Sequence, residues 1–345
     1  MAVIRMADDG IAFDGDTLLQ GPLGGAETAF VSLAEALAKR GHDVFVHNRC
    51  KMPMERNGVT WKPLDDHLPD IADLYIANRG HKLIQLVPKA RSRVFWIHNP
   101  AQYLNKWRYW RKLLRWKPII VFSSKFHSKS IAPLMPNGGL TTIPYGISDA
   151  FLNAKISAIP PPPHVAFTSS PLRSLDWLLD LWASEIKPGV SAAQLHVFSS
   201  PKTYGAHGDA RSGAMNEVLN RAAGMSEQGV VLRKPLSKAN LAKALAGFRV
   251  MLYRGDPGET YCLAVGEAQA IGLPAVVQNI GCVSERVING ETGFVAFNDS
   301  DFVHYGREIL TDDILWRRLH ASALERQRSY SWDNAAEAFE KLAFR

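Results

Sequence analysis

The chain has 345 residues, of which 46% are hydrophobic, and its formal net charge is +7 at neutral pH. This length exceeds what one hydrophobic core usually serves, so we expect two domains of roughly 150 to 180 residues. No apolar run approaches the roughly 20 residues that cross a bilayer, and the N-terminus lacks the apolar core of a signal peptide. We therefore expect a cytoplasmic protein rather than an integral membrane protein.

The net charge and the cysteine content indicate which classes of partner and which cellular compartment to expect. The excess of positive charge favours an anionic partner such as a nucleotide, a nucleic acid or an acidic membrane. The three cysteines are an odd number without metal-ligand spacing, which predicts reduced thiols and neither a disulfide framework nor a zinc site.

The first motif along the chain is the glycine-rich stretch 21–27, which precedes a helix-period pattern ended by Gly41. Gly24 and Gly25 let backbone N–H groups approach a ligand at the positive end of a helix dipole, where phosphate or sugar oxygens are favoured. A tight turn whose glycines serve only geometry explains the same residues. Local chemistry leaves both interpretations open.

Short β-rich runs alternate with helical stretches in both halves of the chain, a pattern typical of parallel sheets covered by helices. The runs are 42–47, 73–77, 93–98 and 118–123, then 164–168, 195–198, 230–233, 250–253 and 275–278. Four consecutive prolines at 160–163 favour a stiff connector between the halves. We predict an N-terminal domain over 1–158, a C-terminal domain over 159–330, and a terminal helix within 331–345.

The segment from Tyr103 to Lys117 contains six cations and five aromatic residues. On one continuous helix, Tyr103, Trp107, Trp110 and Leu114 would share an apolar stripe flanked by basic residues. This profile is typical of a helix lying on an anionic membrane, which would serve a membrane-bound acceptor such as a lipid-linked saccharide or a lipopolysaccharide core. A stripe packed on the chain's own sheet fits equally well, and no recognition motif supports nucleic-acid binding.

The most specific motif is a pair of carboxylates within the stretch 256–274. The pattern of this stretch predicts a strand, a glycine loop, a helix and a second strand. Glu259 would lie in the loop before the helix, and Glu267 would project from the helix toward the same crevice. One carboxylate can accept hydrogen bonds from ribose hydroxyls and the other can orient a sugar. A helix-capping charge and a solvated surface residue are the alternative interpretation from spacing alone.

Six motifs occur in order over nearly the whole chain. They are 24–27, 96–100, 143–147, 169–175, the Glu259 and Glu267 pair, and 281–295. Together they resemble glycosyltransferase family 4. The resemblance implies an α/β protein of GT-B architecture: two facing Rossmann-like domains with parallel sheets, an interdomain active-site cleft, and a last helix that returns to the N-terminal domain.

The resemblance also implies site roles. Glu267 would bind the ribose, Glu259 the donor sugar, and Gly25 would lie against the diphosphate, with His98 contacting the donor sugar from the N-terminal domain. Arg173 best matches the diphosphate-binding arginine, and a second cation would be Lys234 or Lys238. The implied catalytic residues are His98, Arg173 and Glu259, and the implied binding residues are Gly24, Gly25, Arg173, Lys234, Lys238, Glu259, Thr260, Tyr261, Cys262 and Glu267.

Two residues depart from the family pattern. Cys282 replaces a common second glycine near the donor, and Ser174 stands where glycine is usual. Both changes bear on donor specificity more than on activity.

The implied activity is a retaining, metal-independent hexosyltransferase that uses a nucleotide-diphosphate sugar and acts on a saccharide or lipid-linked acceptor of the lipopolysaccharide or polysaccharide type. Retention fits a same-face reaction in which the leaving phosphate helps deprotonate the acceptor, because no residue stands out as a nucleophile. Two alternatives remain. One is a GT-B phosphorylase or sugar-nucleotide epimerase, and the other is a catalytically silent nucleotide-sugar-binding module at a membrane.

Overall fold

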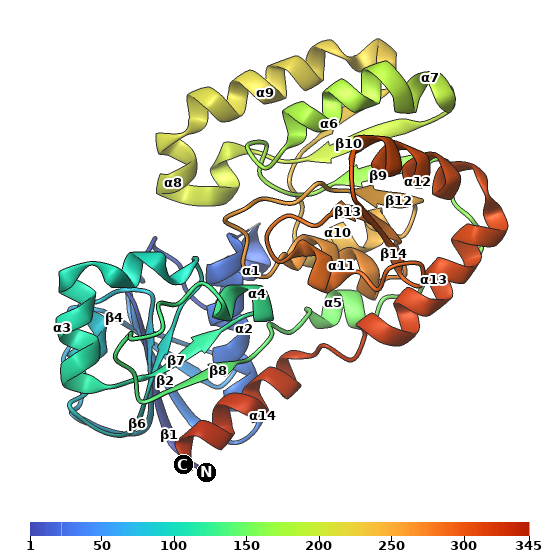
Figure 1. Ribbon diagram of the computed structural model, residues 1–345. Helices are drawn as coiled ribbons and strands as arrows, with labels where there is room; N and C mark the ends of the chain where they lie inside the picture. Colours follow the sequence, from blue (N-terminus) through green and yellow to red (C-terminus); the bar gives the residue numbers. More distant parts are fainter. Residues whose placement is uncertain (22, 345) are drawn as a thin grey trace. The chain divides into compact units, whose positions relative to one another are not determined.

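The computed structural model describes residues 1–21 and 23–344, which form two compact α/β units (Figure 1). The first unit contains residues 1–20, 25–146 and the end of the chain from Tyr330 onward. The second contains Ile147–Ser329 and a short segment of the glycine loop that ends at Gly24.

The first unit is built on an eight-stranded sheet with the order β3-β4-β2-β1-β5-β6-β7-β8. All neighbouring strands pair in parallel except β3, which is antiparallel to β4. The strands are β1 (Val3–Asp8), β2 (Asp43–Asn48), β3 (Met54–Arg56), β4 (Val59–Pro63), β5 (Ile71–Asn78), β6 (Lys89–Trp96), β7 (Ile119–Phe122) and β8 (Gly139–Thr142). The central strand β1 is absent from the predicted runs, although its buried apolar residues follow the strand pattern.

The helices of the first unit connect these strands. They are α1 (Thr17–Gln20), α2 (Gly25–Lys39), η1 (Leu83–Gln85), η2 (Ala101–Asn105), α3 (Trp107–Trp116), α4 (Lys125–Ser128) and α14 (Trp332–Ala343). Helix α14 begins with Ser331, whose side chain accepts a hydrogen bond from the backbone of Asn334, and its apolar face is buried. Phe339 on that face packs against Trp96 of β6, and Arg40 forms ion pairs with Asp333 and Glu340. The terminal helix therefore packs within the first unit.

The second unit is built on a six-stranded, fully parallel sheet with the order β11-β10-β9-β12-β13-β14. The strands are β9 (His164–Phe167), β10 (Gln194–Phe198), β11 (Val230–Arg233), β12 (Val250–Leu252), β13 (Ala275–Gln278) and β14 (Gly293–Ala296). This order is that of the doubly wound dinucleotide-binding fold, in which the chain direction along the sheet reverses between the first and fourth strands. Here that reversal lies between β9 and β12.

Helices cover both faces of this second sheet; Figure 1 shows α6 and α9 on one side and α10 and α11 on the other. The helices of the unit are α5 (Asp149–Leu152), α6 (Leu175–Leu181), η3 (Trp182–Ile186), α7 (Lys187–Gly189), η4 (Pro201–Tyr204), α8 (Gly205–Ala210), α9 (Ser212–Gly224), η5 (Ser226–Gln228), α10 (Lys238–Leu245), α11 (Leu263–Ala270), η6 (Val283–Arg286), α12 (Asp299–Thr311) and α13 (Asp313–Gln327).

The division between the units lies after Gly146, which is earlier than the predicted boundary at residue 158. Ile147 and Phe151 are completely buried, and α5 packs against α10 and α11 of the second unit. The boundary was predicted at the proline run because prolines interrupt regular secondary structure. Buried apolar contacts, however, decide which unit a segment belongs to.

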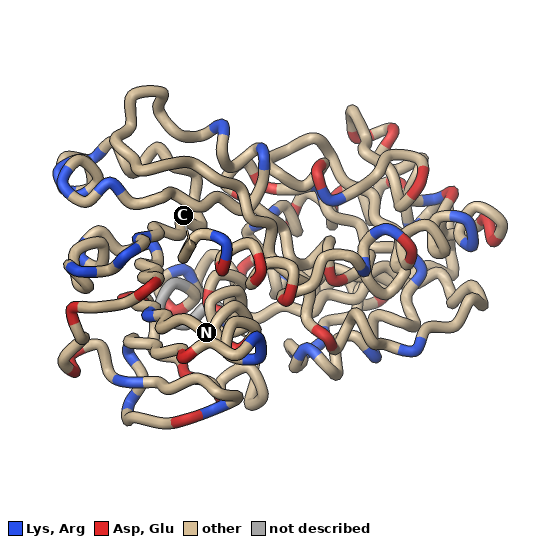
Figure 2. Tube along the Cα trace, turned by 90° about the horizontal axis from the view of Figure 1, so that it is seen from below, with Lys and Arg blue, Asp and Glu red and all other residues tan. Residues whose placement is uncertain are grey.

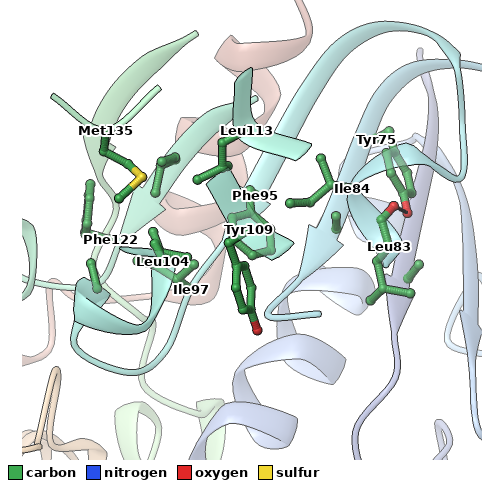
Figure 3. Close-up of a cluster of buried hydrophobic side chains, with 14 of the residues drawn as sticks. Tyr75, Leu83, Ile84, Phe95, Ile97, Leu104, Tyr109, Leu113, Phe122 and Met135 are labelled. Atoms are coloured by element: carbon green, nitrogen blue, oxygen red, sulfur yellow. Dashed lines mark hydrogen bonds between the residues drawn. The ribbon is translucent and has the colours of Figure 1, made fainter. Parts of the chain in front are cut away.

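The basic aromatic segment does not form one continuous helix. The backbone is extended at Lys106, so Tyr103 belongs to η2 and only the remaining aromatic residues belong to α3. Figure 3 shows Tyr109 and Leu113 of α3 inside the buried cluster that also contains Phe95 and Phe122. Tyr103, Trp110 and Trp116 pack against the same cluster.

Only part of the predicted apolar stripe is therefore available at the surface. Trp107 and Leu114 are 70% and 54% exposed, whereas Tyr103 and Trp110 contribute to the core. Among the described residues, no helix is long and apolar enough to cross a bilayer.

Candidate active site

The first cluster of polar side chains lies in the second unit at the carboxyl ends of β9 and β12. Open parallel sheets bind ligands at the point where the strand order reverses, outside the carboxyl ends of the strands. The loop after β9 contains Arg173, and the loop after β12 contains Glu259. The fold thus brings together two residues that are 86 positions apart in the sequence.

Glu259 is buried, with 3% of its surface exposed, and both carboxylate oxygens have protein partners. Arg173 donates from Nη1 to Oε1 at 2.5 Å, and the Tyr253 hydroxyl donates to Oε2 at 2.7 Å. The Arg173 side chain is 40% exposed. The cluster therefore combines a fixed carboxylate with a guanidinium that remains accessible to an anionic ligand.

Burial raises the pKa of Glu259, while Arg173 and the Tyr253 hydroxyl act in the opposite direction by favouring the charged form. Burial also raises the pKa of the Cys262 thiol well above its usual range. A thiol that stays protonated is a weak nucleophile, so the chemistry of the cluster centres on the carboxylate.

Glu267 lies on α11 with 4% of its surface exposed, which is incompatible with a solvated surface residue. Its Oε1 atom is 2.5 Å from Nζ of Lys238, the first residue of α10. Lys234 is exposed in the loop after β11. Of the two predicted candidates for a second cation, Lys238 is therefore the one held beside a predicted binding carboxylate.

The residues between the two carboxylates are buried. Thr260, Tyr261 and Cys262 have little exposed surface, and Cys262 precedes α11 with a left-handed backbone. The Tyr261 hydroxyl accepts a hydrogen bond from Nη1 of Arg286 at 3.0 Å, and the guanidinium lies 4.5 Å from the ring centroid. The side chain of Tyr261 thus supports the loop from inside.

The two departures from the family pattern have structural explanations. Ser174 has a φ of 61°, a left-handed conformation that favours glycine, and its hydroxyl donates to the Gly255 carbonyl. Cys282 is completely buried, and its backbone N–H donates to the Glu259 carbonyl at 3.1 Å. Its thiol therefore fills space beneath the Glu259 loop.

The second cluster lies in the first unit, at the carboxyl ends of β1 and β5, where that sheet also reverses its strand order. Asp8 has no exposed surface and accepts hydrogen bonds from the Gly10 N–H at 2.7 Å, Asn78 Nδ2 at 2.5 Å and Arg79 Nε at 2.9 Å. Arg79 adopts a φ of 52°, which is uncommon for a side chain of its size.

The predicted residue His98 joins this second cluster. Its Nε2 atom is 2.5 Å from Oδ1 of Asn78, and its Nδ1 atom is hydrogen-bonded to the Tyr145 hydroxyl. Burial, Arg79 and His127 together lower the pKa of His98 well below its usual range. His98 is therefore neutral at physiological pH.

The glycine-rich motif is linked to the same cluster through Glu27. Gly25 is the first residue of α2 and is exposed, whereas Gly24 is buried. Glu27, in the first turn of α2, forms an ion pair with Arg79 at 2.8 Å. The start of α2 is thus tied to the charged groups that surround Asp8.

Sequence reasoning missed Tyr253 and the partners of His98, namely Asp8, Asn78, Arg79 and Tyr145. Asp8 and Asn78 end the buried strands β1 and β5, and Arg79 and Tyr253 directly follow β5 and β12, whereas Tyr145 lies three residues after the edge strand β8. A polar residue directly after an apolar run is the signal that could have indicated them, because parallel sheets collect such residues at one edge.

The chain matches known glycosyltransferases in both sequence and fold. Residues 163–312 match the family described as Glycosyl transferases group 1. A D-inositol 3-phosphate glycosyltransferase of Nocardioides sp. is 30% identical over 117 residues, which are 33% of this chain and only 25% of that relative's length. The match thus spans about a quarter of that relative.

Solved structures match over the full length. Anabaena HepE, in complex with UDP and glucose, has a TM-score of 0.72 with 13% identity and 99% coverage of both chains. WaaG, a glycosyltransferase involved in lipopolysaccharide biosynthesis, has a TM-score of 0.66 with 13% identity and 99% coverage of both chains. The architecture is thus that of the GT-B glycosyltransferases, as predicted. The sequence match to the group 1 glycosyltransferases covers residues 163–312, which lie in the second unit.

Proposed function

We propose that this protein is a retaining hexosyltransferase that uses a nucleotide-diphosphate sugar as donor. The observation that supports this most directly is the cluster of Arg173, Glu259 and Tyr253 at the strand-order reversal of the second unit. That unit contains the region matching the group 1 glycosyltransferases. The complex of Anabaena HepE with UDP and glucose supports a uridine nucleotide as the first donor to test.

In the proposed reaction, an acceptor hydroxyl attacks the anomeric carbon on the face from which the diphosphate leaves. The bond from carbon to phosphate oxygen breaks, the new glycosidic bond forms, and the hydroxyl proton passes to the leaving phosphate. Arg173 neutralises charge on the diphosphate, and Lys238 is the candidate for a second cation. Glu259 accepts hydrogen bonds from the sugar, and Glu267 accepts them from the ribose.

We propose that the reaction needs no metal ion. The sequence contains two Asp-x-Asp pairs, at 14–16 and 299–301, of the kind that could hold one. Each of these four carboxylates accepts a hydrogen bond from a protein group or forms an ion pair with one. For example, Asp16 forms an ion pair with Arg56, and Asp299 accepts a hydrogen bond from Trp177. Unchanged transfer in the presence of EDTA is the expected result.

For the acceptor we propose a saccharide or a lipid-linked saccharide, and for the location the cytoplasmic side of a membrane. WaaG, with its role in lipopolysaccharide biosynthesis, supports this class of acceptor. The exposed face of α3 supports contact with anionic lipid: Trp107 and Leu114 lie among Lys106, Arg108, Arg111, Arg115 and Lys117. Figure 2 shows basic residues in blue toward its left edge, where Figure 1 places α3. Among the described residues, no ion pair involves these five cations.

The first experiment is calorimetric titration of the purified protein with UDP, GDP, ADP, CMP and their common sugar conjugates, without added metal. We expect one nucleotide family to bind and its sugar conjugate to be turned over with a suitable acceptor, with the product anomer retaining the donor's configuration by NMR. Binding without turnover would favour the silent module. Release of a sugar phosphate or an epimerised nucleotide sugar would favour the phosphorylase or epimerase alternative.

A further inference from the structure

A directed chain of hydrogen bonds runs through the first unit from Tyr145 to Asp8. The Tyr145 hydroxyl contacts His98 Nδ1, His98 Nε2 contacts Asn78 Oδ1, and Asn78 Nδ2 contacts Asp8 Oδ2. All four side chains are buried, and each follows or ends a different strand of the same sheet.

The direction of this chain follows from the chemistry of Asp8. Three donors converge on its carboxylate: the Gly10 N–H, Arg79 Nε and the Asn78 amide nitrogen. Because a carboxylate only accepts, the NH₂ group of Asn78 must face Asp8, and its carbonyl oxygen must face His98. An amide oxygen also only accepts, so the proton of the imidazole must lie on Nε2. The remaining ring nitrogen, Nδ1, then accepts from the Tyr145 hydroxyl.

We propose that Asn78 and Tyr145 are positioning residues that hold His98 as a neutral imidazole with its proton on Nε2, and that Asp8 sets this orientation through Asn78. Both ring nitrogens are then used within the protein. A sugar hydroxyl would then contact the ring carbon atoms or the main chain of His98. The residue would form a fixed, uncharged surface beside the sugar and would not act as a general base.

The charges around His98 favour the same state. Arg79 and His127 both oppose a positive imidazolium, and burial acts in the same direction. The carboxylates of Asp8 and Glu27 are each engaged by Arg79, at 2.9 Å and 2.8 Å. Tyr145 and Trp96 present aromatic rings to the imidazole, at centroid distances of 5.8 Å and 4.8 Å. A buried site of this kind gives a second proton little stabilisation.

The catalytic consequence rests on the proposed function, but the protonation state does not. In glycosyl transfer, positive charge develops on the donor sugar in the transition state. A histidine that stayed neutral at the working pH would add no opposing charge there.

The test is a long-range ¹H–¹⁵N correlation spectrum of the ¹⁵N-labelled full chain, with the His98 signals assigned by their loss in His98→Gln. We expect the pattern of a neutral Nε2–H tautomer that does not titrate between about pH 6 and 8. His127 serves as an internal reference, because its Nε2 faces the Asn99 carbonyl and its Nδ1 faces the Ser123 N–H. A proton on Nδ1 of His98, or on both ring nitrogens, would overturn the proposal.

Two variants test the assigned partners. In Asn78→Leu, the carbonyl acceptor is lost, so His98 should move its proton to Nδ1 and donate to the Tyr145 hydroxyl, while His127 stays unchanged. In Tyr145→Phe, Asn78 remains and the Nε2–H tautomer should persist. An Asn78→Leu protein that retains the Nε2–H pattern would show that Asn78 does not set the tautomer. If Asn78→Leu does not fold, the wild-type spectrum and the spectrum of Tyr145→Phe still test the proposal. A changed His98 tautomer in Tyr145→Phe would contradict the proposed roles of Asn78 and Tyr145.

Once a donor is known, sugar transfer by the same variants gives a separate result. We expect Asn78→Leu to lower kcat about tenfold, the effect of roughly one lost positioning interaction, with nucleotide affinity unchanged. The proposed function fails if no nucleotide sugar is used by the wild type, whereas the positioning proposal fails on the spectra. A normal kcat in a variant with a shifted tautomer would remove the catalytic role.

Discussion

The two polar clusters occupy equivalent places in their sheets but differ in how much of them ligands can reach. In the second unit, Glu259 is buried while its partner Arg173 is 40% exposed. In the first unit, Arg79 is held between two carboxylates with buried side chains, Asp8 and Glu27. From this difference we expect Arg173 to bind an anion from solution and Arg79 to support the structure around His98.

The largest effect should come from Glu259→Ala. The variant removes the carboxylate to which Arg173 and Tyr253 donate, and we expect sugar transfer to fall by roughly 10²- to 10³-fold, the usual effect of losing one preorganised electrostatic contact. Initial rates with the donor identified by calorimetry measure it. Circular dichroism and nucleotide affinity are the controls and should stay near wild type. Near-normal turnover would remove Glu259 from the site.

Arg79→Ala should lower the stability of the first unit rather than remove a ligand contact. It leaves Asp8 and Glu27 buried without their guanidinium, a change that typically costs about 3–5 kcal/mol. Urea unfolding of this variant and of Arg173→Ala measures the contrast. Arg173→Ala should lose less stability but most of its transfer activity, because it leaves a single carboxylate, Glu259, which keeps the hydrogen bond from the Tyr253 hydroxyl. Equal losses of stability would contradict the distinction between the two arginines.

Tyr253→Phe should show how the Tyr253 hydroxyl affects the pKa of Glu259. The hydroxyl favours the charged carboxylate, so its loss raises the pKa of Glu259 further. In the proposed reaction the ionised form of Glu259 accepts hydrogen bonds from the sugar, so we expect activity to be lost as pH falls through this pKa and the acid limb of the rate profile to move to higher pH. At neutral pH we expect a loss of roughly tenfold, since a hydrogen bond to a charged group contributes about 1.5–3 kcal/mol. An unshifted acid limb would assign that limb to another group.

Glu267→Ala should weaken nucleotide binding and leave the chemical step largely intact. We expect an increase in the Kd for the free nucleotide of about tenfold, equivalent to roughly 1.4 kcal/mol. Titration calorimetry measures the Kd, and kcat at saturating donor is the companion measurement. The matched variant Lys238→Ala should also weaken binding if this lysine contacts the diphosphate. A kcat loss as large as that of Glu259→Ala would contradict the separate roles.

The smallest effect concerns the surface of α3, where two tryptophans of one helix have different environments. Trp107→Ser should reduce sedimentation with anionic vesicles a few-fold without lowering Tm, because Trp107 is 70% exposed. Trp110→Ser should instead lower Tm, because Trp110 packs against the core cluster. Vesicle binding unaffected by Trp107→Ser would assign this face another role.

Much of the fold was predictable because its signals are local. All nine predicted β-rich runs overlap strands of the structure, since each combines apolar residues over about the length of one strand. The edge strands β3 and β8 have no buried residues and gave no such signal. The segment 103–117 was predicted only in part, because a helical wheel assumes a continuous helix and the extended backbone at Lys106 separates Tyr103 from α3.

The sequence by itself determined the α/β class, the glycine-rich start of α2, and the positions of Glu259 in the loop before α11 and Glu267 on that helix, because these depend on residue types at short spacings. The tertiary structure decided which residues surround them. Tyr253 and Arg173 reach Glu259 only because β9 and β12 are neighbours, and Asn78 and Tyr145 reach His98 only because β5, β6 and β8 end at the same edge of one sheet. Strand order depends on the packing of the whole sheet, which no short stretch of sequence specifies.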